Sequence, residues 1–279
     1  MKNLTRREFI GASAALAAAG LMPISGNAQG DSTLSRIRQT KTLKLGVVAG
    51  GEPNYHKDSA TGQWSGILID FADDLAGSLN AKLALSETTW GNAIMDLQSN
   101  KIDLFLGLNP TPQRQAVIDF TTPLYNNVFS LITTENFRGK TWDDLNKPDV
   151  TIAVDVGSSY DNLITHICPN ARIQRFETSN AATLAVQTKR ADVQPLVITL
   201  AAGIIKKNPS VGKLVVPEPF KQTSSCAGVR KEADKEWLNY LNGWLANLHK
   251  SDVTRQIVLS NLDRLMGVKP SDIPSIVTF

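Results

Sequence analysis

Residues 90–122 read WGNAIMDLQSNKIDLFLGLNPTPQRQAVIDFTT, and this stretch decides the fold. It predicts a short helix at 93–98 and an apolar strand at 102–106. The strand runs into a turn at Gly107, a residue that lets backbone groups approach a ligand closely. Because ligands of open α/β sheets bind beyond the carboxyl ends of the strands, this turn is a candidate binding site.

A helix is expected directly after the turn, and it carries the strongest candidate for holding an anion. Thr111 followed by Pro112 is typical of an N-cap and a first helical position. Arg114 then lies in the first helical turn, from which it can reach back over the strand end. Its planar fork could hold a carboxylate by two parallel hydrogen bonds, although composition alone favours a solvated helix residue.

Strands and helices alternate on both sides of this stretch, which predicts an α/β fold. Residues 29–36 look like a poorly ordered start, and 117–134 form an extended, apolar, β-prone segment between two such blocks. The two blocks suggest two lobes, with a later return of the chain to the first. The expected strands are 42–48, 82–86, 150–154, 171–176, 191–197 and 224–229, and the expected helices are 66–80, 158–167, 180–189, 199–207 and 231–249.

A second candidate site follows the strand at 150–154. Gly157 permits a turn, and Ser158 can cap the helix that comes next. The free N–H groups at such a helix start could bind an anion. An ordinary N-cap that binds water remains the alternative.

The order and spacing of these motifs resemble the bacterial extracellular solute-binding proteins of family 3, the polar amino-acid receptors of ABC importers. From Trp90 the chain matches the family's W-x-x-x-I/L-x-x-L-x-x-x-K-I-D and G-x-x-x-T-P-x-R blocks. The stretches at 62–75, 157–159 and 189–192 resemble further family motifs. The resemblance covers about residues 40–262 in one register.

This resemblance implies a two-lobed type II periplasmic-binding-protein fold, a Venus flytrap whose hinge is two crossing strands near Asn127 and Ser224. Lobe 1 would comprise residues 34–127 plus 223–264, and lobe 2 residues 128–222. Residues 265–279 would form a C-terminal tail for which no role is derived.

The resemblance also implies roles for individual residues. Arg114 would bind the carboxylate of the ligand. Five further residues would contact the ligand beside it: Gly107, Asn109 and Thr111 from lobe 1, and Ser158 and Ser159 from lobe 2.

One departure from the family concerns the amino group of the ligand. Where the family usually has an aspartate that accepts hydrogen bonds from an α-ammonium, this chain has Val197. A buried cation without a partner costs several kcal/mol, so an ordinary amino-acid pose is in question. We hypothesise that Asp155 or Glu52 supplies the missing charge; alternatively, Asp155 faces solvent or caps a neighbouring helix.

Two aromatic residues complete the expected site. The family often offers an aromatic shelf in the loop at 50–55, and Tyr55 is the one candidate there. Trp90 could line the cleft, although a buried core tryptophan fits the sequence as well.

The N-terminus has the pattern of an export signal, which predicts a periplasmic protein. A basic start precedes the apolar run 9–21, and small residues at 26–28 suggest cleavage after Ala28. Residues 5–10, which contain Arg6 and Arg7, resemble the twin-arginine motif, with an ordinary Sec signal as the alternative.

Composition excludes several classes of partner and cofactor. Loss of residues 1–28 would change the net charge from +3 to +1. A net charge this small does not indicate binding to nucleic acid. Cys168 and Cys226 are expected to be unpaired and buried. The three histidines are scattered, so neither a metal nor another cofactor is expected.

The function expected from these observations is capture of a small carboxylate-bearing solute by lobe closure, by a monomer that docks on an ABC permease. A cyclohexadienyl dehydratase-like enzyme is one alternative. By resemblance, those enzymes carry a glutamate just after the strand that ends at Val197, where this chain has residues 198–202 without an acid. A ligand-sensing module for a membrane receptor is another. The identity of the ligand, and whether it has an amino group, stay open.

Overall fold

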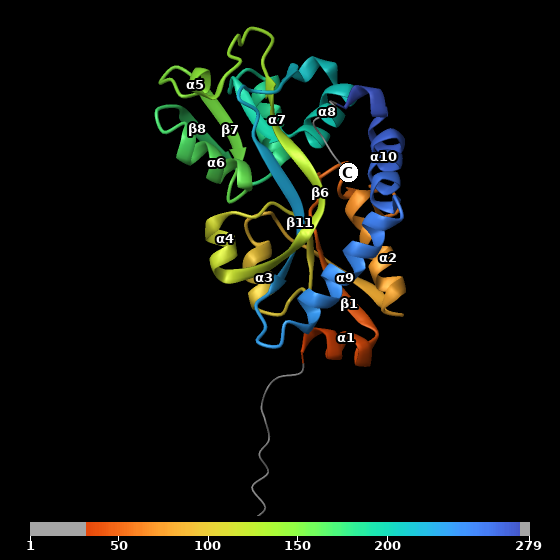
Figure 1. The fold of residues 1–279 in the computed structure, drawn as a ribbon. Coiled ribbons are helices and arrows are strands. Elements are labelled where there is room, and N and C mark those ends of the chain that lie inside the picture. Colours follow the sequence, from red (N-terminus) through yellow and green to blue (C-terminus); the bar gives the residue numbers. More distant parts are fainter. Residues whose placement is uncertain (1–31, 274–279) are drawn as a thin grey trace, which may run out of the picture. The chain divides into compact units, whose positions relative to one another are not determined.

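Two long antiparallel strands, β6 (Ile118–Thr133) and β11 (Gln222–Arg230), run side by side through the computed structural model, which describes residues 32–273 (Figure 1). Asn127 pairs with Thr223 where the two strands pass between the lobes. The register of the pair shifts beside Pro123. Proline has no backbone N–H to donate to the neighbouring strand, so the strand pairing is locally irregular there although β6 continues as one strand.

Lobe 1 contains the strands that lead to the first candidate site. β1 (Thr42–Val47) pairs in parallel with β4 (Lys82–Glu87), and a bridge from Leu45 to Leu104 places β5 (Phe105–Leu108) beside β1. A small hairpin joins β2 (His56–Lys57) to β3 (Trp64–Ser65). The helices of this part are α1 (Thr33–Thr40), α2 (Ile67–Ser78), α3 (Ala93–Gln98), α4 (Pro112–Val117), α9 (Glu236–Lys250) and α10 (Val253–Met266), followed by a short 3-10 turn, η2 (Pro270–Asp272).

Lobe 2 also combines parallel strands with helices. β7 (Thr151–Asp155) is parallel to β8 (Arg172–Phe176) and to β9 (Val193–Val197), while β9 and β10 (Lys213–Val215) are antiparallel to β6. The helices here are α5 (Trp142–Leu145), α6 (Ser159–Ile167), α7 (Ser179–Gln187) and α8 (Ile198–Lys207), with a 3-10 turn, η1 (Pro209–Val211).

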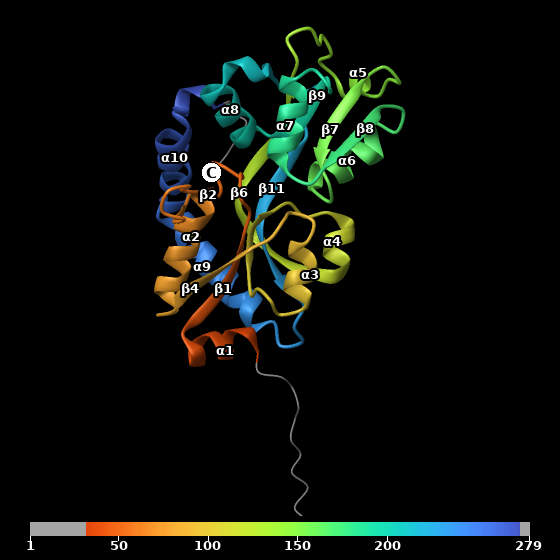
Figure 2. The ribbon, with the colours of Figure 1, turned by 180° about the vertical axis from the view of Figure 1, so that it is seen from behind.

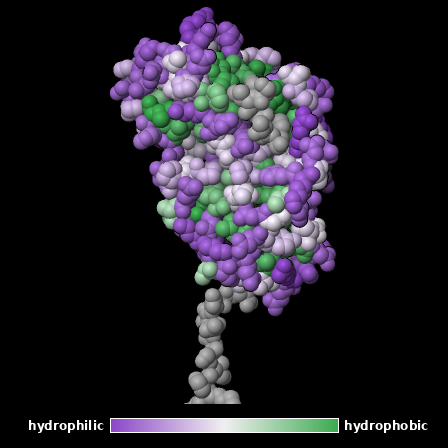
Figure 3. All heavy atoms as spheres, in the orientation of Figure 1, coloured by the Kyte–Doolittle hydropathy of each residue, from purple (hydrophilic) through white to green (hydrophobic). Residues whose placement is uncertain are grey.

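Two hydrophobic cores support the two lobes. One is built around Phe71, Phe105 and Trp237, and the other around Trp142 and Ile152, all of them buried. Hydrophilic side chains cover most of the face in Figure 3, where hydrophobic residues show in separate groups. The two-lobed α/β fold expected from the sequence is therefore confirmed, while the residue numbers of its boundaries stay a prediction.

The C-terminal helix contacts both lobes. α10 packs on α2 of lobe 1 and on α8 of lobe 2, and the two views of the ribbon show α8 and α10 as neighbours (Figures 1 and 2). Met266 lies against Gly203, where an added Cβ would stand 2.5 Å from the methionine Cε. Ala202 of α8 accordingly belongs to the core of lobe 1.

The structure corrects three expectations about secondary structure. Residues 33–40 form a capped helix rather than a disordered start, because Leu34 and Ile37 are buried in the core of lobe 1. The helix expected at 231–249 begins only at Glu236. Helix α10 was not expected. The predicted signal segment 1–28 lies outside the described residues. None of the described helices is long and apolar enough to cross a membrane.

Candidate functional site

A cavity lies between the lobes, at the carboxyl ends of strands from both sheets. Ligands of open α/β sheets bind at such ends. The lobes stand close together: the cavity encloses about 20 Å³, room for roughly one water molecule. Its walls come from both lobes and from the strands that join them: Asn54, Trp90, Gly107, Asn109, Arg114, Tyr125, Asn127, Ser158, Ser159, Tyr160, Val197, Leu200 and Ser225.

Arg114 is the one charged side chain among the described residues that line this cavity. Thr111 caps α4 by accepting a hydrogen bond from the Arg114 backbone N–H, which places the arginine over the end of β5. The side chain is 7% exposed, and burial lowers its pKa to about 10, so the guanidinium stays charged at neutral pH. An arginine held this way is a ready partner for a carboxylate.

The guanidinium of Arg114 donates to backbone carbonyls of both lobes. Nη1 donates to Asn109 at 3.0 Å and Nη2 to Trp90 at 3.2 Å, both in lobe 1. Nη2 also donates to Gly157 at 3.1 Å, at the start of α6 in lobe 2. The arginine thus joins the two faces of the cleft.

Asn109 makes a second connection across the cleft. Its side-chain oxygen accepts a hydrogen bond from the Ser159 hydroxyl at 2.8 Å, and its amide donates to the Ser224 carbonyl of β11 at 2.9 Å. The backbones also approach closely, because an added Cβ on Gly157 would stand 2.9 Å from the Cα of Gly91. The turn after β5 therefore meets the start of α6 directly.

Asp155 ends β7 and is 3% exposed. Neither of its carboxylate oxygens meets a donor in full hydrogen-bond geometry. Burial raises the pKa of this carboxyl, while the nearby hydroxyls of Ser179 and Ser158 and the charge of Arg114 lower it by less. Asp155 does not line the cavity; it stands behind Ser158 and Tyr160, which do.

The structure brings together six of the ten residues singled out in the sequence: Gly107, Asn109, Arg114, Ser158, Ser159 and Trp90 all line the cavity. Thr111 and Asp155 stand beside it. Tyr55 is fully buried, and its hydroxyl donates to the Leu106 carbonyl. Glu52 lies in a separate depression with residues of α7 and α8, and pairs with His56 at 3.2 Å. Their roles in binding stay predictions.

Seven further residues line the cavity that the sequence did not single out as ligand contacts: Asn54, Tyr125, Asn127, Tyr160, Val197, Leu200 and Ser225. Asn127 was named only as a hinge position, and Val197 only as a departure from the family. The position of the hinge could have revealed several of them, because strands that cross between the lobes must pass beside the cleft. Tyr160 directly follows Ser159 at the start of α6. The sequence pattern that identified Ser159 could therefore also have identified Tyr160.

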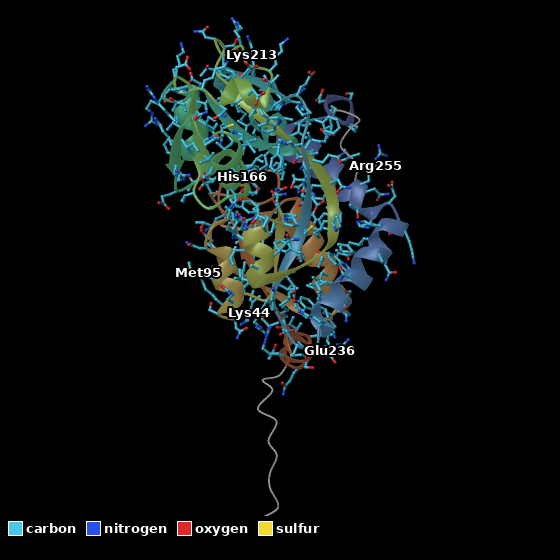
Figure 4. The ribbon with its side chains drawn as sticks, turned by 60° about the vertical axis from the view of Figure 1, so that its left-hand side comes forward. Lys44, Met95, His166, Lys213, Glu236 and Arg255 are labelled. Carbon is cyan, nitrogen blue, oxygen red and sulfur yellow. The ribbon has the colours of Figure 1, made fainter. Side chains whose placement is uncertain are left out.

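Several exposed or reactive side chains lie apart from the cavity. Met95 (62% exposed, on α3) and His166 (on α6) sit on the surfaces of different lobes (Figure 4). Cys168 and Cys226 are free and buried, as expected. Within residues 32–273, no group of three His, Cys, Asp or Glu side chains could hold a metal ion.

Known proteins share this fold over nearly the whole chain. The L-cystine-binding protein of Escherichia coli is 24% identical over 90% of this chain and 92% of its own length. The cyclohexadienyl dehydratase of Pseudomonas aeruginosa is 23% identical over 87% and 90%. The crystal structure of an ancestral amino acid-binding protein, described as a precursor of cyclohexadienyl dehydratase, is 31% identical and covers 84% of this chain and 99% of its own, with a TM-score of 0.74.

The sequence model of one protein family matches most of this chain, including the strands and helices that form the cleft. It matches residues 43–261, from β1 to α10, and so includes Arg114 and the start of α6. The chain belongs to the bacterial extracellular solute-binding proteins, family 3.

Proposed function

We propose that this protein is the exported, periplasmic binding component of an ABC importer, and that it captures a small carboxylate-bearing solute between its lobes. The buried guanidinium of Arg114 in a cavity whose other lining residues are uncharged is the observation that carries this proposal. The family and its relatives support the transport role.

The contacts across the cleft suggest how capture proceeds. In the closed form Arg114 donates to the Gly157 carbonyl. When the lobes open, this bond breaks and a solute carboxylate can take the freed donor. The start of α6, capped by Ser158, then closes on the same carboxylate with its N–H groups and the Ser159 hydroxyl. Contacts to both lobes favour the closed form, which would dock on the permease.

A thermal-unfolding screen with Arg114→Ala tests the proposal. Amino acids and other small carboxylic acids are added to the mature protein, and a bound ligand raises the unfolding midpoint. Arg138→Ala is the matched control, because Arg138 is exposed and bonds only to nearby carbonyls of its own loop. We expect Arg114→Ala to lose about 2–5 kcal/mol of binding free energy and Arg138→Ala to bind like wild type. Equal responses of all three proteins would overturn the carboxylate role of Arg114.

A dehydratase is the second candidate, and Asp155 is the observation that favours it. A buried carboxyl with a raised pKa can donate a proton to a leaving hydroxyl group, and one relative is named a cyclohexadienyl dehydratase. Incubation with prephenate or arogenate and detection of an aromatic product tests this candidate. Absence of turnover by wild-type protein would remove it.

A further inference from the structure

The chain passes from β7 into α6 through a type II turn. The Ser158 N–H donates to the Asp155 carbonyl at 3.2 Å, which closes the turn. Gly157, its third residue, has φ +71°, whereas Val156 before it has no positive φ. A positive φ at the third position alone distinguishes a type II turn from a type I turn, in which the central peptide group is reversed. That central group joins Val156 to Gly157, so its orientation defines this turn.

The orientation of the turn decides which groups lobe 2 presents to lobe 1. An added Cβ on Gly91 of lobe 1 would stand 3.2 Å from the Val156 carbonyl oxygen and 3.6 Å from the Gly157 Cα. The N–H and C=O of a trans peptide point in opposite directions. Because the Ser158 N–H points back into the turn, the Gly157 carbonyl points out of it and accepts from Arg114. Reversal of the central peptide would disturb both contacts.

Asp161 supplies the acceptor that fixes the central peptide. Its Oδ2 accepts from the Gly157 N–H at 3.1 Å, and its own N–H donates to the Ser158 hydroxyl oxygen at 3.1 Å. Its Oδ1 accepts from Arg175 Nε at 2.9 Å and from the Thr165 hydroxyl at 3.2 Å. Arg175 also donates to the Thr165 oxygen at 2.8 Å. The carboxylate is buried outside the cavity and is held from both ends by lobe 2 itself.

We propose that Asp161 is a positioning residue for solute capture. By accepting the Gly157 N–H it holds the turn in the orientation that presents lobe 2 to Arg114, and Arg175 holds Asp161 in place. This inference rests on the proposed capture of a solute at Arg114. A turn that is already ordered needs no further ordering when the solute binds, and such preorganisation raises affinity. An acid in the first turn of a helix that acted only on the helix dipole would stabilise α6 without affecting the turn.

Asp144 is the matched control for a purely stabilising acid. It stands at the third position of α5, as Asp161 does in α6. It accepts from the backbone N–H groups of Lys140 and Thr141 and pairs with Lys147 at 3.1 Å. It does not line the cavity. Asp144→Ala and Asp161→Ala should therefore both lower the unfolding temperature, while only the second should change the turn.

Amide exchange of the mature protein, with ¹⁵N-labelled glycine and no ligand added, measures the turn directly. Gly157 is exposed, so its N–H exchanges freely with water once its acceptor is lost. We expect Asp161→Ala to speed this exchange at least about tenfold and to shift the Gly91 resonance in the other lobe. Asp144→Ala should change neither. Arg175→Gln removes a partly exposed charge without touching the turn and should speed the exchange by a smaller factor, so it tests the inference even if Asp161→Ala does not fold.

Calorimetry then measures the effect on capture. The probes are amino acids and small carboxylic acids, L-glutamine, L-arginine and L-cystine among them. A probe that binds wild type should bind Asp161→Ala at least about tenfold more weakly and Asp144→Ala as tightly as wild type. Equal exchange of the Gly157 amide in wild type and Asp161→Ala overturns the inference, and so does unchanged affinity once the turn is freed. If Arg114→Ala binds the probes like wild type, or if wild type binds none, the proposed function fails, while the exchange data test Asp161 independently.

Discussion

Arg114 and Asp155 stand at the two faces of the cleft, and burial acts on both in the same sense. It lowers the pKa of the arginine to about 10 and raises that of the aspartate, because a buried charge loses its hydration. Tyr160 is the other titratable group beside Asp155, and burial raises its pKa too. Of the three groups, Asp155 is the one whose pKa moves upward from the acid range.

The stability of the unliganded protein should therefore depend on pH. The unfolded-state pKa of Asp155 is near 3.8, and the folded value is higher. Its contribution to the stability of the unliganded protein is full below 3.8 and is lost as the pH rises through the folded value.

Thermal unfolding at a series of pH values upward from 3.8 measures this trend. Asp155→Asn should become more stable relative to wild type as the pH rises through the folded pKa of Asp155. If the stability difference between the variant and wild type did not change with pH, Asp155 would not titrate in the folded protein.

Gly107 should tolerate no side chain. It has φ +82°, and an added Cβ would stand 2.4 Å from Leu68 Cδ1, which belongs to a fully buried side chain. Gly62 has φ +72° with nothing within 4 Å, so Gly62→Ala measures the backbone strain alone, about 1–2 kcal/mol. We expect Gly107→Ala to lose about 1–3 kcal/mol more in a denaturant titration. Equal losses would show that Leu68 moves aside freely.

At the scale of elements, helix α4 sets the position of Arg114. The helix is only six residues long, and the Thr111 side chain caps it through the Arg114 N–H at 3.3 Å. Thr111→Ala should cost about 1 kcal/mol of stability and weaken ligand binding between about 3-fold and 100-fold, because the guanidinium loses its orientation. Calorimetry beside thermal unfolding separates the two effects.

Thr141→Ala provides the matched control for that cap. Thr141 caps α5 in lobe 2 in the same way and does not line the cavity. Its loss should lower stability by a similar amount and leave affinity unchanged. Wild-type affinity in Thr111→Ala would mean that the contacts of the arginine with Asn109 and Trp90 are enough to position it.

Local signals explain which elements could be predicted. Thr111 with Pro112, and Ser158 after Gly157, are capping patterns within a few residues, and both helices begin where expected. Helix α10 begins after Asp252, which has a left-handed backbone and makes no capping hydrogen bond. Asp252 is a residue type common at N-caps, but here it does not cap the helix, whose stability comes from buried residues such as Val258 and Leu262.

From the sequence, only those cavity residues that belong to a local motif could be predicted. Arg114 and Ser159 belong to local patterns, but Asn54 lies in a loop and Ser225 in a strand, far apart in the chain. They meet because β6 and β11 carry the chain between the lobes and because the loop after β1 folds over the ends of the strands. Such long-range proximity leaves no pattern in a single sequence. The same holds for Asp155, whose unpaired oxygens become apparent only once its neighbours are placed.

At the scale of the whole molecule, α10 links the two lobes outside the hinge strands. It is part of the core of lobe 1, and at its end Met266 contacts Gly203 of α8. Helix α8 starts directly after Val197 and has Leu200 in its first turn, so the same helix also forms part of the cavity wall. Ile273, beyond α10, packs near Val128 and Ile198 at the point where β6 enters lobe 2. Opening of the lobes must therefore move α8 against α10.

This arrangement predicts that a change remote from the cavity alters ligand affinity. Met266 is 5% exposed, so Met266→Ala should cost about 2–5 kcal/mol of stability. It also removes a contact that favours the closed lobes, and apparent affinity falls with the fraction of competent closed protein. Val258→Ala, two turns earlier in α10 and fully buried, should lower stability without changing affinity. Thermal unfolding and calorimetry on both variants test this prediction. Unchanged affinity in Met266→Ala would mean that α8 and α10 move as one body. The hinge would then lie entirely in β6 and β11.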